Sequence, residues 1–273
     1  SPASEPETIA IQEYLGAIFS KQVQSPVGGS GSSSRSGTFL DIHSYGGLVY
    51  WPWGSSSDPP PDAMALQSMG RKLAYFTGYH PEQSSTMYYT DGESEDFAYG
   101  EIGVAAFCIE VGTEFFEECD EFENVILQPN LEALIYAAKA SRSPYEIPRG
   151  PDIAAIDLSN HETGFLLNVL VDARGYSNVN GTETVRKIAG AELYIDTPPW
   201  IESATPFPLS AVDGRFDSAV EQASAVIGSI PLAPGQHILY VRGYNSDGEF
   251  GAVSAVFFQK TGAHEFIELL LLQ

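Results

Sequence analysis

The stretch "FLDIHSYGGLVYWPWG", residues 39–54, decides how the first half of this chain is interpreted. An apolar segment runs into His43, continues through Ser44, Tyr45 and two glycines, and ends in Trp-Pro-Trp. This pattern predicts a strand over residues 38–45 with the histidine near its end. An imidazole there is either a packed structural histidine or a metal ligand presented at the rim of a sheet. The rest of the chain has to decide between these two.

The composition is that of a folded globular protein. The chain has 273 residues, 43% hydrophobic and 12% aromatic, which is enough for one large domain or two ordinary ones. It carries 36 acidic against 13 basic residues, a formal net charge of −23. So few cations cannot form a phosphate-binding surface, and we therefore expect no nucleic-acid partner. No apolar run reaches about 18 residues, so we also expect no membrane span.

The first part of the chain carries three helical patterns. Ser4 and Glu7 form a capping box, which predicts a helix start at Ser4. Two more helices are predicted over 59–78, ending at Gly78, and over 130–145. The apolar stripe of the last helix is predicted to consist of Leu131, Leu134, Ile135 and Ala138.

Between these helices, residues 103–112 form a continuous apolar strand of the kind found at the centre of a sheet. Its one carboxylate is Glu110, and burying a carboxylate costs free energy unless a cation, a hydrogen bond or a raised pKa compensates. Glu110 is therefore the best general-base candidate in the chain. The alternative is a strand-edge glutamate that faces solvent. Strands alternating with helices predict an α/β layered domain over residues 1–148.

From residue 149 the pattern changes to short alternating strands separated by Gly, Pro, Asn and Asp turns. Six strands are predicted over 153–160, 165–174, 188–196, 224–232, 236–245 and 251–260. Their spacing predicts an all-β, immunoglobulin-like sandwich over 149–261, followed by a tail over 262–273. No motif in this part carries chemistry.

Four ordered motifs in the first part point to a known family. They are "ASEPET", "HSYGGLVYWPWG", "GYHPEQSSTMYYTDGESEDFAYG" at 78–100, and "FCIEVG". Together they resemble the zinc metallocarboxypeptidases of the carboxypeptidase A/B/T type, nearest the bacterial carboxypeptidase T branch. The resemblance covers residues 1 to about 145 and the C-terminal part of the catalytic domain. It implies a mixed sheet with flanking helices and removal of the last residue from peptide or protein C-termini.

The resemblance also assigns roles to residues of this chain. His43 matches the third zinc ligand, and Tyr45 matches a tyrosine that lines the peptide-binding subsites. The bond between Ser44 and Tyr45 is cis in that family, so we expect it to be cis here. Tyr88 matches the mobile tyrosine that closes over bound substrate, and Tyr89 is a less favoured rival.

Two carboxylates complete the set that the resemblance implies. Glu110 matches the glutamate that takes a proton from zinc-bound water, whose pKa zinc lowers to about 7, and passes it to the leaving amine. Glu95 falls at the pocket-floor position that selects the side chain of the C-terminal residue. A carboxylate there suits Lys or Arg, and Glu93 can assist. The alternative is that Glu93 and Glu95 lie on a solvated loop.

Other residues that the family requires do not occur. Its remaining zinc ligands come from a His-x-x-Glu motif, and none of the five histidines has Glu three residues later. The Asn-Arg pair that holds the substrate carboxylate does not occur either. We therefore expect a fragment that lacks two zinc ligands, is inactive alone and retains the zinc ion weakly or not at all. The intact enzyme is expected to be a monomer that is secreted or periplasmic, with its leader removed upstream of Ser1.

Two further functions stay open from the sequence. The chain is a non-catalytic peptide-binding protein if the carboxypeptidase-like groove works without zinc. It is an adhesion protein if the sandwich carries the function, although this leaves Glu110 unexplained. The two cysteines, Cys108 and Cys119, either form one bridge or are both free.

Overall fold

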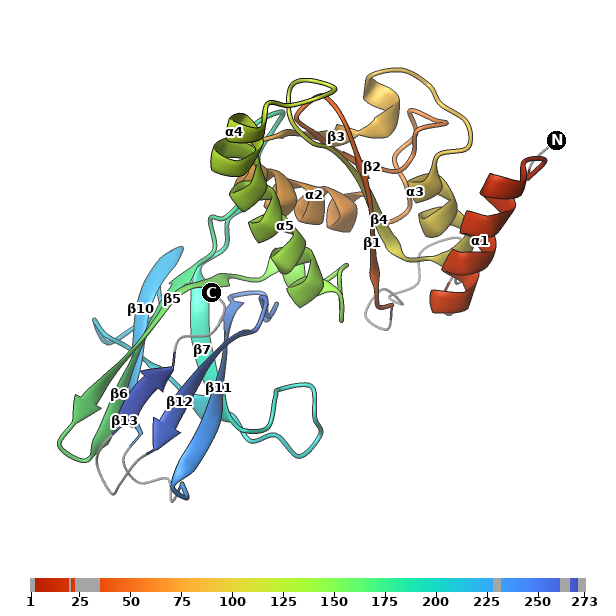
Figure 1. Cartoon of the computed structure of the whole chain (residues 1–273). Coiled ribbons are helices and arrows are strands. Elements are labelled where there is room, and N and C mark those ends of the chain that lie inside the picture. The colour runs from red at the N-terminus through yellow and green to blue at the C-terminus, as the bar shows by residue number, and fades with distance from the viewer. Residues whose placement is uncertain (1–2, 20, 23–34, 228–231, 261–265, 270–273) are drawn as a thin grey trace. The chain divides into compact units, whose positions relative to one another are not determined.

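The computed structural model divides the chain into two compact units. One comprises Ser1–Pro148 with Tyr176–Glu183, and the other Arg149–Gly175 with Thr184–Gln273. The described helices belong to the first unit, and the second is built of strands (Figure 1). None of the described helices is long and apolar enough to cross a membrane. The residues that the structure describes are 3–19, 21–22, 35–227, 232–260 and 266–269.

The first unit is built on a four-stranded mixed sheet in the order β1-β4-β2-β3. Its strands are β1 (Thr38–His43), β2 (Leu48–Trp51), β3 (His80–Gln83) and β4 (Ala105–Glu110). β1 runs parallel to β4, β2 runs antiparallel to β4, and β3 runs parallel to β2. The α/β class predicted for this part of the chain is thereby confirmed.

Helices cover both faces of this sheet. They are α1 (Pro6–Ile18), α2 (Ala63–Thr77), α3 (Ser94–Phe97), α4 (Cys119–Glu121) and α5 (Leu127–Ala140). Short 3-10 turns span Ser84–Thr86 and Ile147–Arg149, and π-helical turns span Ala98–Ile102 and Phe122–Ile126. Figure 1 shows α2 and α5 on one side of the sheet and α3 on the other.

α2 packs closely against the sheet. Its Leu66, Met69 and Leu73 are buried at helical spacing. Gly70 lies between them, and a Cβ added there would lie 2.6 Å from the Trp51 ring of β2. The helix ends at Gly78, as predicted, because this residue adopts the left-handed conformation with φ of 73°.

Two predictions about the other helices are wrong. α1 is capped by Glu5 without any side-chain cap, so Ser4 does not form the predicted capping box. α5 buries a different stripe from the one predicted, and Leu131 and Leu134 are exposed. Its buried residues are Ala133, Tyr136, Ala137 and Ala140. Short alanine side chains let α5 approach α2 closely, which the bulkier leucines would prevent.

The second unit consists of two sheets. One has the strand order β5-β6-β10-β9 and the other β13-β12-β11-β7-β8. The first comprises β5 (Asp152–His161), β6 (Gly164–Asp172), β9 (Ser210–Ala211) and β10 (Val220–Ile227). The second comprises β7 (Ile188–Ile195), β8 (Phe207–Pro208), β11 (Gly235–Asn245), β12 (Ser254–Lys260) and β13 (Phe266–Leu269).

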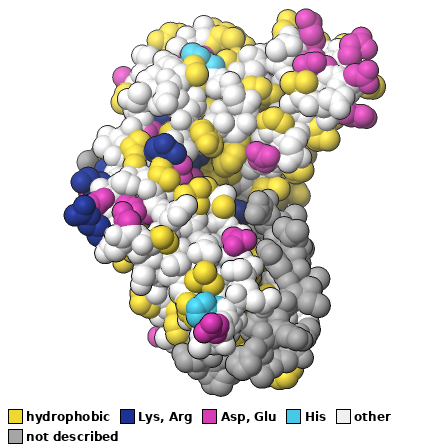
Figure 2. Space-filling model, turned by 90° about the vertical axis from the view of Figure 1, so that its left-hand side faces the viewer, with side chains coloured by type: hydrophobic (Ala, Val, Ile, Leu, Met, Phe, Trp, Pro, Cys, Tyr) yellow, Lys and Arg dark blue, Asp and Glu magenta, His cyan; other side chains and the backbone are white. Residues whose placement is uncertain are grey.

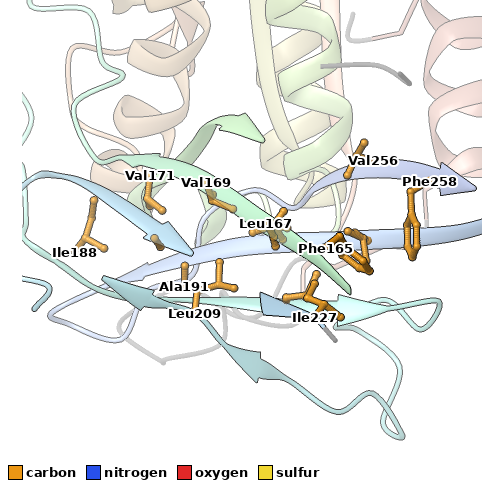
Figure 3. Close-up of a cluster of buried hydrophobic side chains, with 14 of the residues drawn as sticks. Phe165, Leu167, Val169, Val171, Ile188, Ala191, Leu209, Ile227, Val256 and Phe258 are labelled. Atoms are coloured by element: carbon orange, nitrogen blue, oxygen red, sulfur yellow. The ribbon is translucent and has the colours of Figure 1, made fainter. Parts of the chain in front are cut away.

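A single apolar cluster joins these two sheets (Figure 3). β6 supplies Phe165, Leu167, Val169 and Val171, at the period of two that turns alternate side chains to one face. Leu239 and Phe258 belong to the same cluster from β11 and β12 of the other sheet. The unit is therefore a β-sandwich with its core between the sheets.

The six predicted strands correspond to β5, β6, β7, β10, β11 and β12. The predicted strand over 224–232 runs into residues 228–231, which lie outside the described residues. Within the tail expected over 262–273, the described residues Phe266–Leu269 form the edge strand β13, which pairs with β12. Figure 2 shows hydrophobic side chains scattered among polar ones on the face that it draws, as is usual for folded proteins.

Residues Tyr176–Glu183 belong to the first unit, although the boundary predicted at residue 149 places them in the second domain. The reason is Arg71 of α2, which is only 3% exposed, so its guanidinium needs acceptors within the protein. It donates hydrogen bonds to the backbone carbonyls of Ser177, Val179, Asn180 and Gly181. Periodicity does not reveal this contact, because the partners are backbone atoms.

His237 of the second unit is held by acceptors on both sides of its ring. Its Nδ1 lies 2.7 Å from Asp196 Oδ2, and its Nε2 lies 2.8 Å from the carbonyl oxygen of Ala233. Burial lowers the pKa of His237, but the hydrogen bonds to Ala233 and Asp196 outweigh it, so the pKa is raised overall. The folded unit therefore favours the imidazolium form.

We expect Gly70→Ala to lower the free energy of unfolding by about 1–3 kcal/mol, since the new methyl group overpacks the contact with Trp51. This exceeds the roughly 1 kcal/mol that alanine gains over glycine in a helix. Gly16→Ala in α1 is the matched control, because its Cβ meets no atom within 4 Å. Urea denaturation of the whole chain measures both variants, and a stabilised Gly70→Ala protein would contradict the packing described.

We expect the second unit to lose stability as pH rises through the raised pKa of His237. A group whose pKa is higher in the folded state stabilises below its unfolded pKa and ceases to do so above its folded pKa. Asp196→Asn should remove most of this dependence, and Asp157→Asn on the exposed face of β5 is the control. Hydrogen exchange of the β11 amides at several pH values is the measurement. An unchanged pH profile in Asp196→Asn would refute this role.

Candidate active site

The parallel pair β1 and β4 places two of the predicted site residues side by side. His43, the last residue of β1, is the register partner of Glu110, the last residue of β4. Aligned residues of neighbouring strands point to the same face of a sheet. Both side chains line a cavity of about 580 Å³ on this face, which is opposite the face that packs against α2.

The cavity gathers all five residues predicted for the site. Its wall includes His43, Tyr45, Tyr88, Glu95 and Glu110. Tyr89, the rival of Tyr88, is not among the lining residues. The wall also contains residues that were not predicted for the site, namely Asp41, Leu48, Tyr50, Ser84, Met87, Thr90, Ser94, Cys108 and Phe115.

His43 has a carboxylate neighbour on its own strand. Its Nε2 lies 3.1 Å from Asp41 Oδ1, and Asp41 also accepts a hydrogen bond from Ser94 Oγ. Asp41 lies two residues before His43, so the strand period turns both side chains to the cavity. That period was the signal by which Asp41 was identifiable from the sequence.

Glu110 combines partial burial with an unsatisfied oxygen. Burial raises the pKa of Glu110, the nearby His43 lowers it, and Asp41 raises it again, so the pKa lies above its ordinary value. Its Oε2 is buried and finds no hydrogen-bond partner among the described residues. A carboxylate with a raised pKa and a free oxygen facing a cavity is suited to accept a proton.

Glu95 is the most deeply buried carboxylate of the cavity, with 5% of its surface exposed. Burial and the negative charges of Glu93, Asp41 and Asp96 raise the pKa of Glu95 to about 7. Burial, with Glu95 and Glu110 nearby, also raises the pKa of the Cys108 thiol. Glu95 therefore changes charge near neutral pH.

Glu93 is fixed by its neighbours. Its Oε1 accepts hydrogen bonds from the hydroxyls of Ser84, at 2.9 Å, and Thr90. Its Oε2 is buried without a partner among the described residues, and a Cβ on Gly54 would lie 2.0 Å from it. Asp96 holds the same loop by accepting the Gly54 backbone N–H at 3.1 Å. Because Gly54 has no side chain, the Glu93 carboxylate has room beside the cavity.

The charge of the cavity has one sign. Asp41, Glu93, Glu95 and Glu110 line it, and no Lys or Arg is among the described residues of its wall. Carboxylates that share a concave, partly buried space repel one another and attract cations. A cationic group is therefore the ligand that this wall stabilises best.

Tyrosines form the mouth of the cavity. Tyr45 and Tyr88 are 46% and 62% exposed, so both are available to a ligand. The peptide bond between Ser44 and Tyr45 is cis, which confirms the expectation drawn from the family resemblance. The ring of Tyr45 packs edge-to-face against Phe115, with 5.3 Å between ring centroids. The tyrosine of β2, Tyr50, lies deeper.

The metal donors present do not make a complete site. Among the described residues, no group of three His, Cys, Asp or Glu side chains is arranged to hold a metal ion. His43 is the one imidazole in the described wall of the cavity, whereas a catalytic zinc ion takes three protein ligands. Cys108 and Cys119 are both free, and Cys119 is exposed. These residues by themselves do not fit zinc.

We expect Glu95→Gln to stabilise the first unit, and to do so more strongly at about pH 8 than at about pH 5. Between its ordinary pKa of 4.5 and its folded pKa of about 7, only the unfolded state loses the proton, so stability falls as pH rises. The gain at high pH should be on the order of 2–3 kcal/mol. Hydrogen exchange of the β4 amides measures it, with Glu101→Gln as the exposed control. An equal gain at both pH values would contradict the raised pKa.

Comparison with known proteins finds a family model that matches part of the first unit. The family model of zinc carboxypeptidases matches residues 1–128. A zinc carboxypeptidase from Saccharothrix mutabilis subsp. capreolus is 32% identical over 80 residues, which are 27% of this chain and 18% of that protein. The chain thus matches about a fifth of the length of this relative.

Solved structures add little to this. OgpA from Akkermansia muciniphila is 12% identical over 43% of this chain and 29% of its own, with a TM-score of 0.30. An endo-beta-1,4-mannanase from Thermotoga petrophila is 9% identical over 92% of this chain and 60% of its own, with a TM-score of 0.21. At these scores neither likeness bears on fold or function. The resemblance to zinc carboxypeptidases is therefore confirmed for residues 1–128, while the carboxypeptidase T branch and the immunoglobulin-like assignment stay predictions.

Proposed function

We propose that the first unit supplies the general-base and substrate side of a metallocarboxypeptidase active site. The observation that carries this proposal is the alignment of His43 with Glu110 at the ends of two parallel strands, where both side chains line the same cavity. The family match over residues 1–128 supports the same reaction class. The product would be a free C-terminal amino acid released from a peptide.

Each residue has a part that follows from its surroundings. Glu110 holds a proton at its unpaired Oε2 and returns it to the leaving amine, which its raised pKa favours. Tyr45 and Tyr88, at the mouth, hold the peptide by stacking and by hydroxyl hydrogen bonds. His43 would contribute one imidazole ligand. The other ligands do not come from the described residues, so we derive no step through the metal.

We further propose that the preferred C-terminal residue is Arg or Lys. Glu95 and Glu93 face the same cavity, and no cation in its described wall neutralises them. A charge-assisted hydrogen bond to a guanidinium contributes about 1.5–3 kcal/mol, which is at least ten-fold in affinity. The second unit would act as an immunoglobulin-like accessory module of a secreted or periplasmic enzyme.

The test is the binding of peptides that differ only in ending with arginine or with citrulline, its neutral isostere. We expect the arginine peptide to bind about ten-fold tighter to the whole chain at about pH 8, with a smaller preference at about pH 6, where Glu95 gains a proton. Glu95→Gln should reduce the preference, and Glu101→Gln should leave it unchanged. Calorimetry measures this. Equal affinities for the two peptides at both pH values would sink the proposed substrate class.

A second candidate is a peptide-binding protein without catalysis. It is favoured by the single imidazole and by the lack of a three-donor metal group among the described residues. The two candidates differ in what zinc does. Peptide affinity that is the same with zinc and with chelator identifies the binding protein. Peptide affinity that zinc increases, and that His43→Ala makes insensitive to zinc, identifies the peptidase site.

A further inference from the structure

A loop of residues 113–117 displays two aromatic side chains beside the cavity. The Glu117 carboxylate closes the loop by accepting hydrogen bonds from the backbone N–H groups of Thr113 and Glu114. These bonds lower the pKa of Glu117, so it stays ionised. Phe115 and Phe116 then point outward and are 66% and 91% exposed. Such exposure of two neighbouring phenylalanines is unfavourable in water and points to an occupant.

This loop is fixed to the site rather than hanging free. The Gly46 N–H donates to the Gly112 carbonyl at 3.1 Å, and the Val111 N–H donates to the His43 carbonyl at 2.9 Å. Gly112 has φ of 76°, and a Cβ on it would lie 2.4 Å from Glu117 Oε1, so only glycine fits there. The base of the loop is therefore tied to the segment that carries His43.

An aromatic rim follows from this arrangement. We use this name for Tyr45, Tyr88, Phe115 and Phe116, of which the first three line the cavity. Tyr45 and Phe115 pack edge-to-face, and Phe115 packs against Phe116 with 6.2 Å between ring centroids. Tyr45, Phe115 and Phe116 thus form a continuous row of rings that leads from the cavity outward.

The surroundings of the rim are acidic. From residue 73 to residue 138 the chain contains 14 acidic residues and no Lys or Arg. This span includes the cavity wall from Ser84 onward and the whole loop. Glu114 and Glu118 flank the exposed phenylalanines and are themselves exposed. Exposed aromatic rings among carboxylates bind cations through both the ring faces and the charges.

We propose that the outer end of the aromatic rim, Phe115 and Phe116 with the flanking acids Glu114 and Glu118, selects cationic side chains in the residues upstream of the C-terminal residue of a polypeptide. This inference rests on the proposed function, because it takes the cavity to hold the C-terminal side chain. Charge complementarity selects this occupant: an anionic segment is repelled, and a neutral one gains only the aromatic contacts. The substrate class is thereby narrowed from peptides with one basic end to basic polypeptides.

Four labelled peptides test this. They end in arginine or citrulline, and each ending is combined with either lysine or glutamate at the upstream positions. We expect the upstream lysines to tighten binding to the whole chain about ten-fold at about 50 mM salt, and about two-fold at about 500 mM, because salt screens exposed charges. Fluorescence anisotropy measures the four affinities.

Variants separate the rim from the cavity. Phe116→Ala, outside the cavity wall, should weaken binding of the lysine peptides about five-fold. Glu114→Gln with Glu118→Gln should remove most of the upstream preference and keep the preference for terminal arginine. The control is the double variant Glu7→Gln with Glu13→Gln, at exposed positions of α1, which makes the same change in net charge. It should alter neither the upstream preference nor the preference for terminal arginine.

The outcomes distinguish this inference from the proposed function. The inference is overturned if lysine and glutamate at the upstream positions give equal affinities. It is also overturned if the Glu114 and Glu118 variants bind the peptides as the α1 control does. An upstream effect with equal affinities for arginine and citrulline overturns the proposed C-terminal preference and supports the rim. Dimerisation that Phe116→Ala abolishes, without any peptide preference, assigns the rim to a second copy of the chain and also overturns the inference.

Discussion

The parallel pairing of β1 with β4 is the constraint on which the candidate active site depends. In this register His43 lies beside Glu110, and both point away from α2 into the cavity. A shift of one residue would turn one of the two side chains to the helix-covered face. β2 pairs with the other edge of β4, where Leu48 is the register partner of Glu110, so β4 is held on both sides. The sheet therefore fixes the relative positions of His43 and Glu110.

The cavity tolerates four carboxylates because they are accommodated in different ways. Glu93 is held by two hydroxyl donors and Asp41 by Ser94 and the neighbouring imidazole, while burial raises the pKa values of Glu95 and Glu110. Like charges held this close together destabilise the free protein and favour a cationic occupant. The same charge continues over the loop that displays Phe115. The negative potential of the cavity thus extends over the surface beside it.

Sequence reasoning succeeded where a local pattern carried the information. The strand before His43, the apolar strand that ends at Glu110 and the helix that ends at Gly78 are all present. It failed where several weak preferences compete. On α5, bulky leucines predicted the buried stripe, but alanines occupy it. Asp41 went unnoticed because a single acidic residue in a strand has no motif, although the strand period places it with His43.

The sequence by itself determined the strand before His43, the strand that ends at Glu110, the three longer helices of the first unit, the family that residues 1–128 match and the residue types at the site. Only the tertiary structure decided which of them meet. The pKa of Glu95 depends on burial and on carboxylates from other segments, which no local pattern encodes. Likewise, Arg71 recruits residues about a hundred positions away through their backbone carbonyls, and backbone atoms are the same for every sequence.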